Sequence, residues 1–436
     1  MPESFRGEGS WPLHYDVANS DLAWQYKGWP RFVDRANLQT IGDEGLNIFA
    51  DDFMFPVMCL AETALNHNMT TLARFCSDNE VSLAPHGKTT MSPELIHRQL
   101  NAGAWAIAAS TASQARIFRA FGVPRILIAH QVVDPAAVRW IWDELQANPD
   151  VEMICLVDSV EGVEVLESAL TERSDGRPID ALVELGIESG RTGCRTVDEA
   201  IAVAQRISAS SRLRLVGAEG YEGILPFQGD DFSKVDTFLT QLKGLTERLS
   251  ERGLFDHLDE VVVTAGGSMF PDRVVAILGG KWNLGRRVRV VIRPGGYVTH
   301  DSIHYEESGP FGVRSPMDSY PALQPALSLW SYVVSRPEAG LALLGFGKRD
   351  VSYDIDLPIP VSVRRDGQVR HLNGELNVFE LNDQHAFVLV PDDFDLAVGD
   401  VVECGISHPC ASFDRWRAMP IVDDEYNVIG AVRTFF

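Results

Sequence analysis

The 436-residue chain contains no apolar run of 18 residues. Its start, MPESFRGEGSWPLHYD, lacks the basic end and the apolar core of a signal peptide. The first absence argues against a membrane-spanning helix, and the second argues against secretion. We therefore expect a cytoplasmic protein with no membrane partner.

Basic residues are few, because 38 Lys and Arg stand against 61 Asp and Glu and leave a formal net charge of −23. Nucleic acids and anionic membranes are bound through a basic face, so a nucleic-acid partner is not expected either. The acidic residues are spread along the chain, which is typical of an ordinary solvated surface.

Cysteines are few and widely spaced, at positions 59, 76, 155, 194, 404 and 410. They include no CxxC pair and form no dense framework. This spacing favours reduced thiols over disulfides, as in a cytoplasmic protein.

Short β-branched runs alternate with amphipathic segments from about residue 52. The runs predict eight strands, at 81–85, 105–110, 125–131, 152–159, 181–188, 214–221, 260–267 and 289–296. Helices are predicted between them, for example at 92–103, 111–122, 134–145 and 230–253, and several have Ser, Thr or Asp at the start or Gly at the end. Eight such units predict an α/β fold built on a (β/α)8 TIM-type barrel at 46–310.

The pattern changes after about residue 310. Apolar and polar residues alternate between turns, with little helical periodicity, at 328–335, 359–365, 375–381, 385–390, 400–407 and 427–436. These runs predict a second, mainly-β domain at 311–436.

Lys88 stands just beyond the first predicted strand, in APHGKT (84–89). A loop lysine is usually only solvated. In a barrel, however, functional residues gather where the strands end, and a lysine there can form a Schiff base with a carbonyl group. The position favours this second interpretation.

Paired glycines follow the last two predicted strands, in TAGGS (264–268) and RPGGY (293–297). Each pair by itself is only a tight turn. Two such turns side by side expose backbone N–H groups suited to a phosphate, and barrels often hold phosphate at this place. Together with the lysine, they suggest pyridoxal phosphate (PLP).

Two arginines also stand at strand ends, and either is ordinarily a loop residue. Arg191, in ESGRTG, is also suited to donate to the phenolate oxygen of PLP or to a substrate carboxylate. Arg293 is equally suited to face the pyridine nitrogen.

His408 and Cys410, in SHPCASFDRW (407–416), are two residues apart at a strand end. Either alone is more often a structural core residue. At this spacing both side chains point to one face, and imidazole with thiolate suits zinc. Two protein ligands leave coordination positions open, which favours a catalytic metal over a structural one.

Several motifs occur in a fixed order, and together they are more specific than any one of them. They are PHGKT, ESGRTG, EGYEG, TAGGS, RPGGYVTHD, and GD followed by SHPC. On this set the chain resembles the fold-type III PLP enzymes, which share the alanine racemase-like barrel. Within them it is similar to the D-serine dehydratases, D-threonine aldolases and D-3-hydroxyaspartate dehydratases. The resemblance extends from about FPVMCLAETALNHN (55–68) to the C-terminus.

The resemblance implies that Lys88 binds PLP, that Arg191 pairs with its phenolate oxygen and that Tyr221 lies near its ring. The other cofactor-binding residues that we expect are His86, Gly266, Gly267, Ser268, Arg293, Gly295, Gly296 and Tyr297. His408 and Cys410 are the implied ligands of a divalent metal, zinc with manganese as the alternative. A homodimer with its active site at the subunit interface is also implied, as is an N-terminal arm (1–45) that packs with the β domain.

Some positions depart from the family pattern. The usual R-P-H-x-K-T-H reads A-P-H-G-K-T-T here, so that Ala84 and Thr90 replace an arginine and a histidine. The D-A-G and E-E-H-G stretches read GFG (345–347) and NDQHA (382–386). These departures bear on substrate size and subfamily.

The activity that we expect is dehydration and deamination of a D-β-hydroxy amino acid, such as D-serine or D-threonine, to a 2-oxo acid and ammonia. Lys88 would remove the α-proton, and the metal would act as a Lewis acid on the β-hydroxyl. His86, His300 and His385 are candidates for the group that protonates intermediates.

Other functions use some of the same residues. A D-threonine-type aldolase, which yields glycine and an aldehyde, also needs a metal at the hydroxyl; the His-x-Cys pair favours elimination. Racemisation requires a second base and has no use for zinc. A PLP-binding carrier or regulator without turnover would lack a β domain, and structural zinc usually has four protein ligands.

Overall fold

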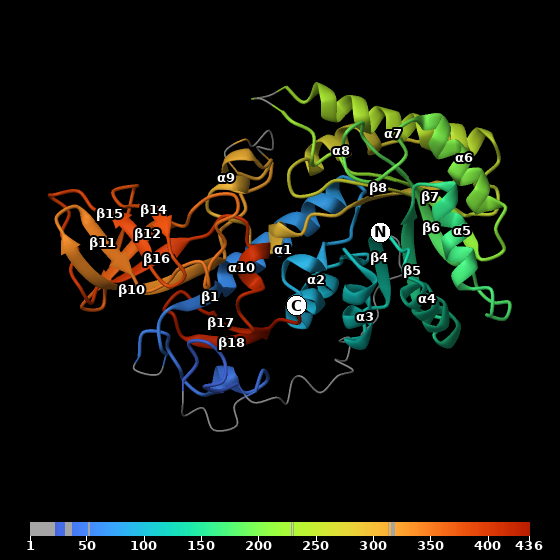
Figure 1. Ribbon diagram of the computed structural model, residues 1–436. Coiled ribbons are helices and arrows are strands. Elements are labelled where there is room, and N and C mark those ends of the chain that lie inside the picture. Colours follow the sequence, from blue (N-terminus) through green and yellow to red (C-terminus); the bar gives the residue numbers. More distant parts are fainter. Residues whose placement is uncertain are drawn as a thin grey trace.

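The computed structural model describes residues 22–30, 37–50, 53–227, 229, 231–312, 314 and 319–436. The predicted arm at 1–45 is therefore described only in part, since 1–21 and 31–36 lie outside these ranges. Figure 1 shows two bodies, an α/β barrel coloured from blue and teal through green to yellow and a β domain mainly in orange and red.

The barrel contains eight parallel strands, and all eight predicted strands are confirmed within a few residues at their ends. They follow the order β2-β9-β8-β7-β6-β5-β4-β3. Their bounds are β2 (Ser82–Leu83), β3 (Ile107–Ala109), β4 (Arg125–Gln131), β5 (Glu152–Val157), β6 (Ile179–Leu185), β7 (Leu213–Gly220), β8 (Glu260–Ala265) and β9 (Arg287–Ile292). The two outer strands meet just past β2, where His86 pairs with Ala108 in a parallel bridge and the Trp105 N–H donates to the Leu83 carbonyl at 2.7 Å.

Small and branched side chains fill the inside of this barrel. One buried cluster joins alternate residues of neighbouring strands, among them Ala84, Ala108, Leu182 and Val291. Ala84, which replaces the arginine of the family pattern, is fully buried in this cluster. The first strand therefore contributes packing, and not a charge, to the barrel interior.

Helices surround the strands (Figure 1). They are α1 (Glu62–Asp78), α2 (Pro93–Asn101), α3 (Ala112–Ala120), α4 (Pro135–Ala147), α5 (Val160–Ala169), α6 (Val197–Ser208), α7 (Ser233–Glu251) and α8 (Pro271–Leu278). The helices α2 to α6 begin after a Ser, Thr or Asp whose side chain accepts a backbone N–H of the first turn. Thr196 and Glu199 complete a capping box at α6.

The β domain is a separate, mainly antiparallel sheet. Its central order is β13-β12-β16-β10-β1-β17-β18, and β11, β15 and β14 extend from β10. The strands are β1 (Val57–Ala61), β10 (Leu327–Glu338), β11 (Leu341–Leu344), β12 (Ile359–Arg365), β13 (Gln368–His371), β14 (Asn377–Leu381), β15 (Ala386–Leu389), β16 (Val401–Gly405), β17 (Ala418–Val422) and β18 (Val428–Arg433). With the barrel, this domain confirms the predicted fold class.

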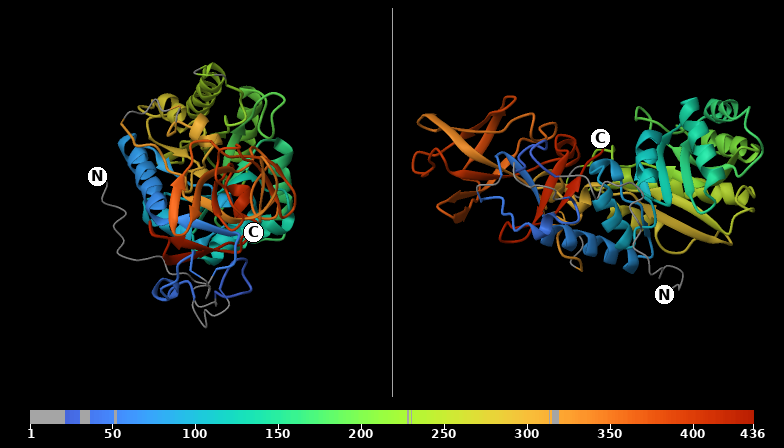
Figure 2. Two further views of the ribbon diagram at one scale, coloured as in Figure 1. Left: turned by 90° about the vertical axis from the view of Figure 1, so that its left-hand side faces the viewer. Right: turned by 90° about the horizontal axis from the view of Figure 1, so that it is seen from below.

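Strand β1 connects the two bodies. Although it lies within the range predicted for the barrel, it pairs antiparallel with β10 and parallel with β17. The chain then enters α1, where the buried Asn68 amide donates to the Gln324 carbonyl at 2.7 Å and to the Val298 carbonyl at 3.2 Å. Figure 2 shows the two bodies side by side, with α1 in blue between them.

The described part of the N-terminal arm contacts the β domain. Tyr26, Trp29 and Ile41 belong to a buried cluster that also contains Trp330. The Trp29 indole N–H donates to the Ala418 carbonyl at 3.2 Å. Among the described residues, no helix combines the length and the apolar character needed to cross a membrane.

Candidate active site

A pocket of about 680 Å³ opens where the barrel strands end, a volume suited to a small-molecule ligand. Most predicted site residues line it, namely His86, Lys88, Arg191, Tyr221, Gly266, Gly267, Ser268, Arg293, Gly295, Gly296, His408 and Cys410. Its lining also includes residues that the sequence did not indicate: Thr89, Ser110, Gln114, Ala129, His130, Thr192, Tyr305 and Ala411.

Lys88 is placed by a short 3₁₀ helix, η2 (Gly87–Thr89), that follows β2. Gly87 is required there, because a Cβ atom at this residue would come within 2.6 Å of the Phe118 ring. All three residues His86, Lys88 and Thr89 line the pocket, but Thr89 is buried and His86 half-buried, whereas the Lys88 side chain is exposed. This local fold directs one amine into the barrel mouth.

The two glycine turns lie next to each other, after β8 and β9. Gly266 has a φ of +86°, a conformation that favours glycine, and its N–H donates to Glu222 Oε2 at 3.0 Å. The Gly296 N–H donates to Ser268 Oγ at 3.3 Å, which links the turns. A Cβ atom on Gly295 would overlap Thr89 Oγ1. The turn after β9 thus lies so close to the loop that carries Lys88 that no side chain fits between them.

Tyr297 belongs to η3 (Gly296–Val298) but does not line the pocket. Its side chain is buried, which raises the pKa of its phenol, and it contacts Gln99. Tyr305, from α9 (His304–Ser308), lines the pocket, and a Cβ atom on Gly296 would lie 2.9 Å from its ring. No motif spacing in the sequence distinguished these two tyrosines.

The two arginines differ in their surroundings. The Arg191 guanidinium lies 4.1 Å from the centre of the Tyr221 ring and is open to the pocket. Arg293 is buried, donates to Thr264 Oγ1 at 2.9 Å and forms an ion pair with the buried Glu219. Burial raises the pKa of Glu219, while the charge of Arg293 opposes that shift. Arg293 is therefore held rigidly.

A further carboxylate is buried in the barrel wall. Glu184 is buried on β6 and accepts hydrogen bonds from Gln131 Nε2 and from Thr192 Oγ1, the latter at 2.9 Å. Burial, and next the charge of Glu219, raise the pKa of Glu184 to about 7. The wall of the barrel below the pocket is thus rich in buried carboxylates.

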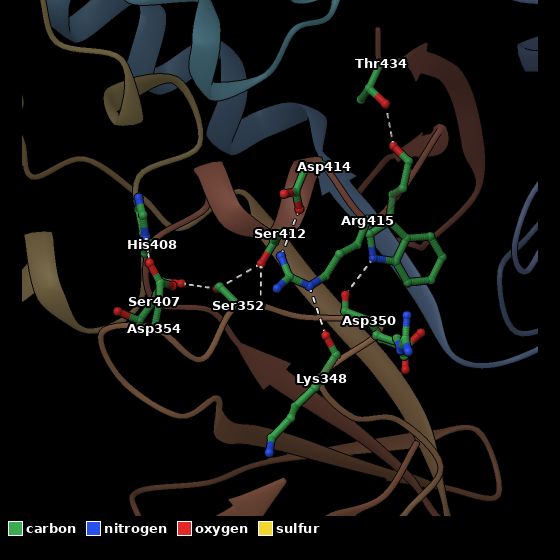
Figure 3. Close-up of polar contacts among 12 residues, drawn as sticks. Lys348, Asp350, Ser352, Asp354, Ser407, His408, Ser412, Asp414, Arg415 and Thr434 are labelled. Carbon is green, nitrogen blue, oxygen red and sulfur yellow. Dashed lines mark hydrogen bonds and ion pairs between the residues drawn. The ribbon is translucent and has the colours of Figure 1, made fainter. Parts of the chain in front are cut away.

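His408 and Cys410 reach the same pocket from the other domain. Cys410 begins α10 (Cys410–Phe413), and its Sγ lies 3.3 Å from Thr89 Oγ1, next to Lys88. His408 Nδ1 lies 2.6 Å from Asp354 Oδ2 (Figure 3). One chain therefore brings the lysine and the predicted metal pair together.

His408 and Cys410 shift each other's pKa. Burial acts to raise the pKa of Cys410, but hydrogen bonds with His408 and Thr89 and the charge of Lys88 bring it below the ordinary value. The hydrogen bond with Cys410, supported by Asp354, raises the pKa of His408 to about 9. An imidazole and a readily ionised thiol in contact are a suitable donor set for zinc.

These residues fit the groups that the resemblance implies. Glycine turns without side chains, an amine in the same pocket and the buried Arg293 suit PLP, and the buried His86 Nδ1 has no partner among the described residues. In the described part of the chain no three His, Cys, Asp or Glu side chains form a metal-binding group. His408 and Cys410 therefore remain two candidate ligands in this pocket.

The three histidines considered as proton donors are placed differently. Only His86 lines the pocket, and burial, then the charge of Lys88, lower its pKa. His300 is buried outside the lining, 3.1 Å from Glu306, and burial lowers its pKa to about 4. His385 is exposed next to β15. His130, which lines the pocket, was not among the predicted candidates.

Comparison with solved structures defines the fold. The crystal structure of D-threonine aldolase from Filomicrobium marinum superposes with a TM-score of 0.72 at 22% identity, covering 89% of this chain and 97% of that one. D-threo-3-hydroxyaspartate dehydratase from Delftia sp. HT23 gives a TM-score of 0.67 at 18% identity, covering 88% and 97%. The architecture is that of the alanine racemase-like proteins.

Sequence comparison adds the family. Residues 326–422 match the family described as "Putative serine dehydratase domain". D-threonine aldolase of Arthrobacter sp is 27% identical over 168 residues, 38% of this chain and 43% of that protein. The matched segments span about half or less of the curated relatives. These matches confirm the resemblance to the fold-type III PLP enzymes.

Proposed function

We propose that this protein is a PLP- and metal-dependent lyase that dehydrates and deaminates a D-β-hydroxy amino acid, such as D-serine or D-threonine. The observation that carries the proposal is that Lys88, the two glycine turns and the His408–Cys410 pair line one pocket. The relatives include a 3-hydroxy-D-aspartate aldolase and a D-threo-3-hydroxyaspartate dehydratase, which supports a D-hydroxy amino acid as substrate.

In this proposal Lys88 holds the cofactor through its amine, and the glycine turns with Ser268 hold its phosphate. Arg191 and Arg293 orient the ring, with Arg293 fixed by Glu219. PLP, when bound, supplies the electron sink for the negative charge left at Cα. After substrate binds, the free Lys88 amine takes the proton from Cα on the face that Lys88 occupies.

His408 and Cys410 would hold a divalent metal, zinc with manganese as the alternative. A metal there would supply a Lewis acid for departure of the β-hydroxyl. Contact of Cys410 with Thr89, on the same turn as Lys88, supports a location near the substrate. The metal pair and the proton-accepting amine would then act on neighbouring carbon atoms.

An aldolase is the second candidate, because named relatives and a solved structure are D-threonine aldolases. The same residues would serve if the β-hydroxyl proton, and not the α-proton, were removed, so that the Cα–Cβ bond breaks. A carrier without turnover is less well supported, since the metal pair would then have no task.

The two lyase reactions differ in their products. We would incubate purified, zinc-loaded protein with D-threonine and measure 2-oxobutyrate, ammonia, glycine and acetaldehyde together. Oxo acid and ammonia that disappear after chelation are the expected result. Glycine with acetaldehyde would replace the dehydratase by the aldolase, and no product from a broad set of D-amino acids would favour the carrier.

Lys88→Ala tests the assignment of the PLP-binding lysine. Lys281→Ala, which changes an exposed loop lysine, is its control. We expect Lys88→Ala to lose the visible absorption of protein-bound PLP and all turnover. Lys281→Ala should keep both. PLP absorption that persists unchanged in Lys88→Ala would contradict the assignment of the lysine.

A cytoplasmic location and a homodimer also belong to the proposal. All six cysteines are free, which supports a reducing compartment. The homodimer, with the active site at the subunit interface, rests on the family resemblance. The exposed Tyr353 and Ile355, on the loop that carries Asp354, are compatible with it.

A further inference from the structure

The loop that carries His408 is fastened to a second loop of the β domain (Figure 3). The second loop runs between β11 and β12. The Ser352 N–H donates to Ser412 Oγ at 3.0 Å, and the Ser352 hydroxyl donates to the Ser407 carbonyl. The Trp416 indole N–H donates to the Asp350 carbonyl at 2.7 Å. These bonds hold the two loops in one register.

The backbone of His408 is itself constrained. Its φ is +48°, a conformation that non-glycine residues rarely adopt. The residue before it is fixed on both sides, because Ser407 Oγ donates to Asp356 Oδ2 at 2.9 Å and its carbonyl accepts from Ser352. Such strain persists only where the surroundings enforce it, and here they direct one imidazole toward the pocket.

Asp354 then fixes the ring of that imidazole. Its Oδ2 lies 2.6 Å from His408 Nδ1, and the exposed fractions of the two side chains are 49% and 28%. A half-exposed ion pair by itself contributes little to stability. In this pair, however, His408 lines the pocket together with Cys410, and Asp354 lies behind it on the neighbouring loop, which indicates a role other than stability.

We propose that Asp354 is a positioning residue for the metal site, an inference that rests on the proposed function. Its carboxylate accepts the Nδ1–H of His408, which leaves Nε2 as the nitrogen that would bind a metal once its own proton is lost. The negative charge also makes the imidazole a stronger donor. Carboxylates behind ligating histidines commonly act in this way, and their loss lowers metal affinity about 10- to 100-fold.

The experiment compares cobalt(II) affinity of the PLP-loaded protein with that of three variants. Asp354→Ala removes the acceptor, and Asp354→Asn keeps an acceptor oxygen but removes the charge. Asp414→Asn is the control, because Asp414 is an equally exposed carboxylate of the neighbouring loop that pairs with Arg415 and not with His408. Affinity is measured by competition with a chromophoric chelator.

We expect Asp354→Ala to lose about 10- to 100-fold in cobalt(II) affinity, Asp354→Asn to lose less and Asp414→Asn to match the parent. The thiolate-to-cobalt absorption should remain in both Asp354 variants, because Cys410 is intact. PLP absorption and the melting temperature verify that each variant is folded. A positional role predicts this order, whereas general destabilisation would lower melting temperature and PLP content together.

Two other outcomes separate this inference from the proposed function. If the parent binds cobalt(II) through Cys410 and Asp354→Ala binds it within twofold, the positioning role of Asp354 is wrong and the metal site remains. If the parent binds no cobalt(II), the metal half of the proposed function fails, and the role of Asp354 fails with it.

Discussion

At the scale of single residues, three glutamate side chains are buried in the barrel near the pocket. Glu184, Glu219 and Glu222 are each at most 3% exposed. Arg293 pairs with only one of them, Glu219, and Glu222 accepts the N–H of a glycine turn. Their charges therefore act on the pocket through Arg293 and through the glycine turn, and not by contact with solvent.

Glu184 makes the stability depend on pH. Its pKa rises from 4.5 to about 7 on folding, so the folded protein binds the proton more tightly than the unfolded chain. The stability that results is present below about pH 4.5 and is lost as the pH rises through 7, by about 3 kcal/mol. We expect Glu184→Gln to remove this loss.

Denaturant unfolding of parent and variant at pH 4.5 and at pH 8 measures the effect. The free energy of unfolding of Glu184→Gln, relative to the parent, should increase by about 3 kcal/mol between the two pH values. Glu188→Gln, at an exposed position, is the control and should show no such increase. An equal pH dependence in Glu184→Gln and the parent would contradict the burial argument.

At the scale of elements, the turn after β9 and the turn after β2 are packed without space between them. A Cβ atom on Gly295 would overlap Thr89 Oγ1 and lie 2.9 Å from His86 Cβ. The φ of Gly295 is −104°, which any residue adopts, so the constraint is steric. A side chain here would displace the loop that carries Lys88.

We expect Gly295→Ala to weaken PLP binding about tenfold or more, because overpacking costs about 1–3 kcal/mol. PLP dissociation constants from absorption titration test this. Gly244→Ala in α7 is the control, since no atom lies within 4 Å of a Cβ placed there. It should keep the affinity and strengthen the helix by about 1 kcal/mol. An unchanged dissociation constant for Gly295→Ala would exclude close coupling of the two turns.

At the scale of the whole molecule, the β domain and the barrel are interlocked by the order of the chain. Strand β1 lies in the middle of the β sheet and leads directly into α1 of the barrel. The described N-terminal residues pack against that sheet. In addition, Lys27 Nζ lies 3.0 Å from Asp350 Oδ1. The loop of Asp350 is also the loop of Asp354. The described part of the N-terminal arm thus contacts the loop that also carries Asp354.

The proposed homodimer is a prediction at this scale. Light scattering should give twice the 48.2 kDa mass of one chain. Ile355, which is 46% exposed on the loop that carries Asp354, is a candidate contact, so Ile355→Asp should shift the protein toward the monomer. Val398→Asp, at a position 61% exposed on the β domain, serves as the comparison. A monomeric parent protein would refute the proposed dimer.

Much of the architecture was predictable because it depends on local chemistry. Periodicity and helix caps predicted the eight barrel strands, and the caps at Ser92, Thr111 and Asp134 marked helices confirmed within a few residues. Lys88, the glycine turns and Arg293 followed from their places at strand ends. These features could be identified without long-range information, since a parallel barrel brings all strand ends to one face.

Other features depended on contacts between distant segments. The sequence did not show that β1 joins the β sheet, that Tyr297 turns away from the pocket while Tyr305 lines it, or that Asp354 lies against His408. These contacts join residues that are far apart along the chain, and no motif or regular spacing in the sequence indicates them. The sequence by itself therefore determined which residue types the candidate site contains, because they stand in short motifs. Only the tertiary structure decided how their side chains are placed, because only the folded chain brings the two loops of the β domain against the barrel mouth.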